Sequence, residues 1–235
     1  MPGSAVIFGL GGLGGAASLT LAAAGVSRLA LVDAGPVEEP DLGMSPLLED
    51  EDLGRPRAAA LSARLAASFP GLDLAPHDAR LEAATATRLL EGAGVALDGA
   101  REPEAKLLAA DAARRAGVPV VHGAVARTSL QLLTVTPRGA GGCLRCLVEE
   151  VAAGLPGAAE LGAWGALARL GGALMAAEAL RLLAGEPGAY DGRLLAFEAR
   201  GARSRLVRVP RRPGCPACGA SEAAGEAAPA PGEGR

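Results

Sequence analysis

Aromatic residues are scarce in this 235-residue chain, which contains three phenylalanines, one tryptophan and one tyrosine. Lysine is nearly absent as well, because Lys106 is the only lysine and arginine supplies the other basic side chains. The formal net charge is −3, so the chain has neither the basic excess typical of nucleic-acid-binding proteins nor the strong acidity of an acidic tail. We therefore expect no nucleic-acid partner.

Charged side chains are missing from the first 27 residues, since Arg28 is the first one. An apolar stretch of this length is long enough to span a bilayer. A secretory signal begins with basic residues, however, and Met1-Pro2-Gly3-Ser4 contains none. Six glycines lie from Gly9 to Gly25, and they suit a buried strand that turns into a helix. We expect this second arrangement, a cytoplasmic location and no membrane partner.

Cysteine is limited to four residues in two pairs of identical spacing, Cys143-Leu-Arg-Cys146 and Cys215-Pro-Ala-Cys218. Two residues between thiolates allow one turn to direct both sulfurs at one metal, and four thiolates are the ligands of closed tetrahedral zinc sites. Disulfides or redox dithiols are the alternative, which a reducing compartment disfavours. The spacing therefore predicts one structural zinc ion. No fifth cysteine remains to act as a nucleophile.

Strand-like and helix-like segments alternate along the chain. This rhythm predicts an α/β fold with a Rossmann-like, mainly parallel sheet covered by helices on both faces, followed by antiparallel strands. The length allows one sizeable core, and we expect one domain over residues 1–219. Residues 220–235, rich in Ala, Pro, Gly and Glu, are expected to form a disordered tail. The expected parallel strands are 5–8, 29–33, 72–76, 94–98 and 118–121, the helices 16–24, 56–68, 83–90, 104–116 and 163–184 (interrupted at 171–172), and the antiparallel strands 130–136, 193–197 and 204–209.

A glycine-rich turn follows the first expected strand and opens the first helix. In such a turn the backbone approaches phosphates closely, and the helix N-terminus supplies N–H groups. Asp33 ends the next strand, where an acidic side chain accepts hydrogen bonds from ribose hydroxyls. Glycines that only pack a helix against a sheet are the alternative. We expect a nucleotide site that includes Gly9, Gly11, Gly12, Gly14 and Asp33.

These motifs occur together in one family. From about residue 5 to residue 219 the chain resembles the ThiF/MoeB/HesA family, relatives of ubiquitin-activating enzymes. The resemblance implies MgATP binding, adenylation of the C-terminal carboxylate of a ubiquitin-like sulfur-carrier protein, and pairing as a homodimer or as a heterodimer with an active relative. The matching stretches are Gly9-Leu-Gly-Gly-Leu-Gly14, Ala24-Gly-Val26, Leu31-Val-Asp33, Gly54-Arg-Pro56, Val121-His-Gly-Ala124, Gln131, Cys143-Leu-Arg-Cys146, Glu178-Ala179 and Pro213-Gly-Cys-Pro-Ala-Cys-Gly219.

The resemblance also assigns roles to single positions, and several of these carry a different residue here. The ribose-binding acid falls on Asp33, which is kept, and a lysine near the next helix falls on Arg57, which keeps the charge. The phosphate-binding arginine falls on Met44, which cannot neutralise a phosphate. The magnesium-binding aspartate falls on Arg101, and the transfer cysteine falls near Ala158. Among these positions, therefore, only Asp33 and Arg57 carry a side chain whose charge suits the role that the resemblance assigns to it.

Electrostatic groups of this kind contribute about 10²-fold each to a rate. We therefore expect a zinc-bound, nucleotide-binding pseudoenzyme whose adenylation is weak or lost, serving as a scaffold or as an inactive partner subunit. The alternative is a functional adenylyltransferase in which Arg101 stands in for magnesium, or in which Asp98 or Glu102 replaces the lost acid. His122 is expected to be a satisfied structural histidine, and the acidic run at residues 49–52 a solvated loop or helix start.

Overall fold

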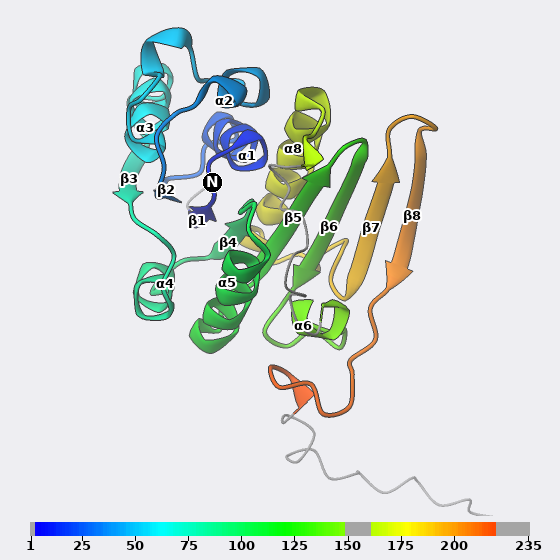
Figure 1. Ribbon diagram of the computed structural model, residues 1–235. Helices are drawn as coiled ribbons and strands as arrows, with labels where there is room; N and C mark the ends of the chain where they lie inside the picture. Colours follow the sequence, from blue (N-terminus) through cyan, green and yellow to red (C-terminus); the bar gives the residue numbers. More distant parts are fainter. Residues whose placement is uncertain (1–2, 149–160, 220–235) are drawn as a thin grey trace, which may run out of the picture.

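One eight-stranded sheet runs through the computed structural model, which describes residues 3–148 and 161–219 (Figure 1). The strand order is β3-β2-β1-β4-β5-β6-β7-β8. The first five strands in this order, β3, β2, β1, β4 and β5, are parallel to one another. Strands β6, β7 and β8 then extend the sheet in antiparallel pairing. The predicted fold class is confirmed. The strands are β1 (Ser4–Phe8), β2 (Arg28–Asp33), β3 (Asp73–Asp78), β4 (Val95–Asp98), β5 (Val120–Ala126), β6 (Ser129–Val135), β7 (Arg193–Glu198) and β8 (Arg203–Arg208).

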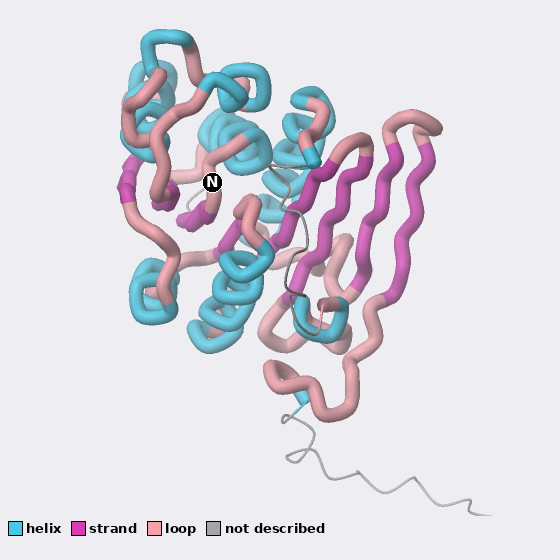
Figure 2. Tube along the Cα trace, in the orientation of Figure 1, coloured by secondary structure: helices cyan, strands magenta, loops and turns pink. Residues whose placement is uncertain are grey.

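Helices cover both faces of this sheet (Figure 2). Helices α1, α3 and α8 pack on one face and α4 and α5 on the other, as the two main core clusters show. Alternate residues of β1 serve the two cores: Ile7 faces α1 and α8, whereas Phe8 faces α4 and α5. The helices are α1 (Gly12–Ala23), α2 (Glu39–Met44), α3 (Arg57–Ser68), α4 (Ala83–Leu90), α5 (Pro103–Ala116), α6 (Leu144–Leu147) and α8 (Gly165–Leu183), with a short 3-10 helix at Asp50–Asp52.

The charge-free N-terminal stretch forms β1 and α1, as the glycine pattern predicts. Helix α1 begins at Gly12, four residues earlier than expected, so part of the glycine motif is already its first turn. Among the described residues, no helix combines the length and the apolar character needed to cross a bilayer.

Helix α8 is continuous, so the interruption expected at its two central glycines is wrong. These glycines serve the packing of α1 against α8 instead. A Cβ added at Gly172 would lie 2.3 Å from the carbonyl oxygen of Leu13, and one at Gly171 would lie 2.6 Å from the Leu13 side chain. The close approach of the two helices compensates for the low helix propensity of glycine.

The acidic run at residues 49–52 is only partly solvated. Asp52 is fully buried, and its carboxylate accepts hydrogen bonds from Arg55 at 2.6 Å and from Arg64 at 2.9 Å. Burial raises the pKa of Asp52, but the bonds from the Glu49 backbone and from Arg64 outweigh this, so the pKa lies below its usual value. Asp52 therefore joins the 3-10 helix to α3, a contact that the local sequence does not reveal.

Candidate functional site

A cavity of about 580 Å³ lies at the carboxyl ends of β1 to β4. The connections that leave β1 and β4 run in opposite directions there, because β1 is followed by β2 on one side and β4 by β5 on the other. Open α/β sheets bind their ligands in the crevice at such a switch point. Gly9, Asp33, Arg57, Arg80 and Arg101 are among the residues that line the cavity. The fold thus brings together four of the residues singled out from the sequence.

The glycine turn after β1 is shaped by tight backbone packing. Gly9 has a φ of +77°, and a Cβ there would lie 2.6 Å from the backbone of Ala100. A Cβ at Gly14 would lie 2.0 Å from the carbonyl oxygen of Gly9. Gly11 instead faces open space, with no atom within 4 Å of its would-be Cβ. Gly9 and Gly14 are therefore needed by the fold itself, whatever the turn binds.

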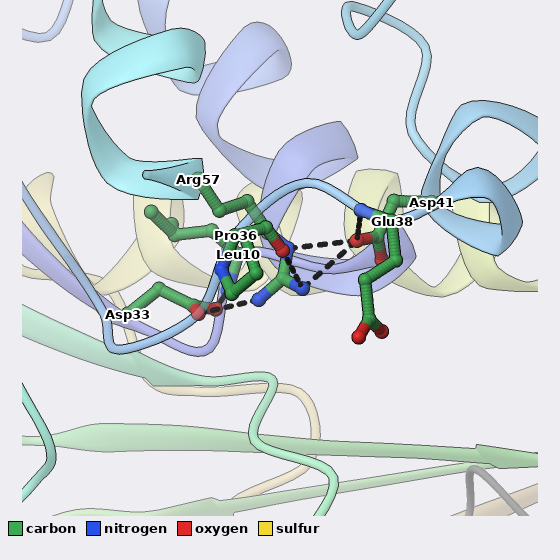
Figure 3. Close-up of polar contacts among 6 residues, drawn as sticks. All are labelled: Leu10, Asp33, Pro36, Glu38, Asp41 and Arg57. Carbon is green, nitrogen blue, oxygen red and sulfur yellow. Dashed lines mark hydrogen bonds and ion pairs between the residues drawn. The ribbon is translucent and has the colours of Figure 1, made fainter. Parts of the chain in front are cut away.

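Arg57, the first residue of α3, turns its side chain inward between two acids (Figure 3). Its Nη1 donates a hydrogen bond of 2.5 Å to Oδ1 of Asp33, at the end of β2. The other carboxylate oxygen of Asp33 accepts a hydrogen bond of 2.7 Å from the backbone N–H of Leu10. Asp33 thereby ties the glycine turn to the start of α3.

Asp41, in α2, is the second acid. Its Oδ2 accepts hydrogen bonds from Nε and Nη2 of Arg57 at 3.0 and 2.8 Å, and from the backbone N–H of Glu38 at 3.0 Å. Nη2 of Arg57 also donates to the carbonyl oxygen of Pro36 at 2.8 Å. The side chains of Arg57 and Asp41 are only 5% and 4% exposed, so this ion pair is buried.

The guanidinium of Arg57 has little capacity left for a ligand. Burial lowers its pKa, but the charges of Asp33 and Asp41 raise it by more, so the group stays charged. Its four hydrogen bonds occupy four of the five N–H donors of a guanidinium. Arg57 therefore lines the cavity as a structural bridge with a single free donor.

A third buried carboxylate, that of Asp98, ends β4. Its Oδ2 lies 2.8 Å from Nδ1 of His122 and 3.3 Å from Nζ of Lys106. Its Oδ1 accepts a hydrogen bond of 3.0 Å from the backbone N–H of Ala100, which fixes the turn after β4. Burial raises the pKa of Asp98, but the charge of Lys106 and the bond with His122 lower it by more, so the net shift is downward.

His122 is buried on β5 beside this carboxylate. The bond to Asp98 places a proton on Nδ1, because a carboxylate can only accept. Its Nε2 has no hydrogen-bond partner among the described residues, so the expectation of a satisfied structural histidine holds for one ring nitrogen only. Neither His122 nor Asp98 lines the cavity.

Met44 and Arg101 lie in different surroundings. Met44 ends α2 and packs on the glycine turn, since a Cβ at Gly12 would lie 3.2 Å from its Cε. Arg169 of α8 donates to the carbonyl oxygens of Gly43 and Met44 at 3.1 and 3.4 Å and so fixes the end of α2.

Arg101 lines the cavity, and among the described residues it forms neither an ion pair nor a hydrogen bond. Ala158 lies outside the described residues.

The four cysteines form the second candidate site. Cys143 precedes α6 and Cys215 follows β8, and all four sulfurs lie within 4.8 Å of one another. The Sγ–Sγ distances include 3.9 Å for Cys143–Cys146, 3.7 Å for Cys143–Cys215 and 3.4 Å for Cys146–Cys218. No cysteine of the described residues is in a disulfide. The cluster could hold a metal ion, as the spacing predicts.

Charged side chains support the cysteine cluster. Arg145, between the first two cysteines, forms hydrogen bonds of 2.8 to 3.1 Å with Asp111 of α5. The backbone N–H of Arg212 donates to Sγ of Cys146 at 3.3 Å. Both contacts join the cluster to the rest of the fold, so the two cysteine pairs are held together by the protein as well as by any metal.

A model of the ThiF family matches residues 3–217. The chain belongs to the ThiF family. SAMP-activating enzyme E1 of Haloferax volcanii is 35% identical over 196 residues, which cover 83% of this chain and 72% of that relative. Sulfur carrier protein adenylyltransferase of Thermus thermophilus is 35% identical over 214 residues, 88% of this chain and 79% of that relative. The crystal structure of E. coli MccB with MccA-N7isoASN has a TM-score of 0.81 at 18% identity, covering 92% and 67% of the two chains, and shows the shared fold.

Two functional-site residues of this ThiF-family protein escape sequence reasoning. Asp41 meets Arg57 only because the fold brings α2 against the start of α3, and no motif spacing relates the two positions. Lys106 lies on α5, where its Nζ reaches Asp98 and donates to the carbonyl oxygen of Gly123 at 2.5 Å. The one available signal is that Lys106 is the single lysine of an arginine-rich chain.

Replacing Arg57 with methionine should lower the free energy of unfolding by about 3 kcal/mol, because it leaves the buried carboxylate of Asp41 without its partner. Urea unfolding followed by circular dichroism measures this. The matched control is Arg88→Met, at an exposed position of α4, which should cost less than about 0.5 kcal/mol. Equal small losses in both variants would contradict the buried network.

The stability of the protein should fall in acid partly through Asp98. Folding lowers the pKa of Asp98. The ionised carboxylate therefore contributes its full share to the free energy of unfolding above about pH 4, the ordinary aspartate range, and this share is lost as the pH falls through the lower folded-state pKa. The free energy of unfolding of Asp98→Asn should therefore depend less on pH between about pH 5 and pH 3 than that of the unmodified protein. Asp73→Asn, at an exposed position, should keep the unmodified pH dependence. Superimposable curves for Asp98→Asn and the unmodified protein would refute this role.

Proposed function

We propose that this protein is a nucleotide-binding, zinc-stabilised member of the ThiF family whose adenylation of a ubiquitin-like sulfur carrier is weak or lost, so that it serves as a scaffold or as the inactive subunit of a pair. The observation that carries the proposal is the position of Arg101. A free guanidinium lines the cavity at the position that the family likeness assigns to a magnesium-binding aspartate. Adenylation releases pyrophosphate, whose charge a bound metal ordinarily stabilises.

Nucleotide binding is supported by the cavity at the switch point. Gly9 and Asp33 line it, and the carboxylate of Asp33 keeps lone pairs for ribose hydroxyls beyond the two hydrogen bonds described above. Among the described residues, the one group of cysteine, histidine or acidic side chains arranged to hold a metal ion is the cysteine cluster. A magnesium ion bound with a nucleotide would therefore depend on single carboxylates of the cavity and on the phosphates themselves.

A working adenylyltransferase is the second candidate. It is favoured by the 35% identity to a protein named as a sulfur carrier protein adenylyltransferase. In this version Arg101 stands in for magnesium, or Asp98 or Glu102 replaces the missing acid; of these three residues, Arg101 and Glu102 line the cavity. The ubiquitin-like carrier is the proposed partner in both versions, because the named relatives activate such carriers.

Zinc is the proposed metal of the cysteine cluster. Four thiolates at 2.3 Å from a tetrahedral zinc ion lie about 3.8 Å from one another. The observed Sγ–Sγ distances of 3.4 to 3.9 Å fit that geometry. The ion would join the segment that begins and forms α6 to residues that follow β8.

We also propose that the protein pairs, either with itself or with an active relative. Support comes from the outer face of α8 and the residue before it, where Leu170 and Trp164 are 42% and 50% exposed. Aromatic side chains such as that of Trp164 are enriched at protein–protein interfaces.

Carrier-dependent exchange of pyrophosphate into ATP tests the proposed loss of catalysis. The unmodified protein, assayed with the ubiquitin-like carrier encoded nearest to it, should give exchange near the background. The Met44→Arg, Arg101→Asp double variant should gain about tenfold or more, because it supplies a cation for the phosphates and an acid for magnesium. Met44→Leu is the matched control and should gain nothing. Strong exchange by the unmodified protein would establish the second candidate instead.

Metal analysis of the purified protein should find about one zinc ion per chain. Cys215→Ser should lose this zinc and unfold at a lower temperature, because metal binding and folding are coupled. Ala217→Ser changes the same turn without removing a sulfur, so it should keep both the zinc and the stability. Zinc-free protein with the stability of the loaded form would count against a structural metal.

A further inference from the structure

The guanidinium of Arg101 lines the cavity and has no ion-pair or hydrogen-bond partner within residues 3–148 and 161–219. Arg101 follows β4, and Ala100, the residue before it, packs on Gly9. The hydrogen bond from Ala100 N–H to Asp98 holds this turn in place. Arg101 is half-buried, lines the cavity, and forms no ion pair with Glu102 or Glu104, which line it too.

Other cations of the cavity are less suited to hold phosphates there. Arg57 is neutralised by two carboxylates and has one free N–H. Arg80 is exposed and follows β3, which is separated from β4 by β2 and β1. Three strand spacings of about 4.8 Å place the ends of β3 and β4 about 14 Å apart. Arg80 therefore lies on the far side of the cavity from Arg101.

We propose that this cavity takes nucleotides as their metal-free anions, with the Arg101 guanidinium bound to the phosphates in the place of a divalent cation. This inference rests on the proposed nucleotide binding and goes beyond it, since it names the ionic form of the ligand. Within residues 3–148 and 161–219, no three carboxylate or histidine side chains around the cavity lie close enough together to enclose a divalent ion by themselves.

Arginine is well suited to this role. Its guanidinium is always charged and presents parallel N–H donors that match two phosphate oxygens. A magnesium ion bound to the same phosphates would compete with it in two ways. The ion would neutralise the oxygens that Arg101 needs, and it would place a second positive charge within a few ångströms of the guanidinium. The cavity should therefore bind ATP at least as tightly without magnesium as with it.

Isothermal titration calorimetry with ATP and with adenosine, each with and without added magnesium, tests the proposal. Magnesium is removed beforehand by dialysis, without a chelator, because a chelator would also strip a metal from the cysteine cluster. For the unmodified protein the ATP affinity should change by less than about twofold, or fall, when magnesium is added. Arg101→Gln should weaken ATP binding about tenfold, as expected when a charged hydrogen-bonding partner is removed. Its affinity for adenosine should stay within about twofold.

The matched control is Arg88→Gln, which removes the same charge from an exposed position outside the cavity and should leave both affinities unchanged. ATP binding that appears only with magnesium, or an ATP affinity that Arg101→Gln does not change, would overturn the inference and leave the proposed nucleotide binding standing. Equal weakening of ATP and adenosine by Arg101→Gln would mean that the residue shapes the cavity, and would overturn the inference too. Binding of neither ligand under any condition would overturn both proposals.

Discussion

The buried guanidinium of Arg57 is the interaction on which the architecture of the cavity depends. It joins the end of β2, the following loop and α2 through Asp33, Pro36 and Asp41. Burying a charge costs several kcal/mol, and only close partners repay that cost. The two carboxylates neutralise the guanidinium of Arg57, so this group offers phosphates no uncompensated positive charge. The proposed phosphate position beside Arg101, at the β4 end, follows from the same arrangement, with Asp33 left to the sugar hydroxyls.

Asp98 has the corresponding role at the opposite side of the cavity. Its carboxylate collects Lys106 from α5, His122 from β5 and the backbone of the turn that leads to Arg101. The side chains that shape the cavity are therefore held by buried charges, whereas Arg101 itself is held only through its backbone. The backbone N–H of Ala100, in the turn before Arg101, is already paired with the Asp98 carboxylate. The guanidinium of Arg101 is therefore not needed to fix this turn and keeps its N–H donors for a ligand.

Periodicity and motif spacing predict the sheet, most helices and the cysteine cluster, because each follows from local pattern. The strand at residues 4–8, the glycine turn and the paired cysteines all depend on neighbours within a few positions. Helix α2 escapes prediction, since Glu39–Met44 contains a proline and a glycine and is stabilised by contacts from α3 and α8. The burial of Asp52 and the Asp41–Arg57 pair escape it for the same reason. Contacts between distant segments decide them, and nothing in the local sequence records those partners.

Several residues of this chain that match the family motifs are also ones that its fold requires. Gly9 and Gly14 prevent backbone clashes, Asp33 receives the N–H of Leu10, and Arg57 compensates two acids. Each would be retained for stability even if the protein bound nothing. Met44 and Arg101 differ, because methionine is an adaptable packing residue and Arg101 has no partner among the described residues. Because no contact within the described residues requires an arginine at position 101, the identity of this cavity residue says more about what the cavity binds than the glycines do.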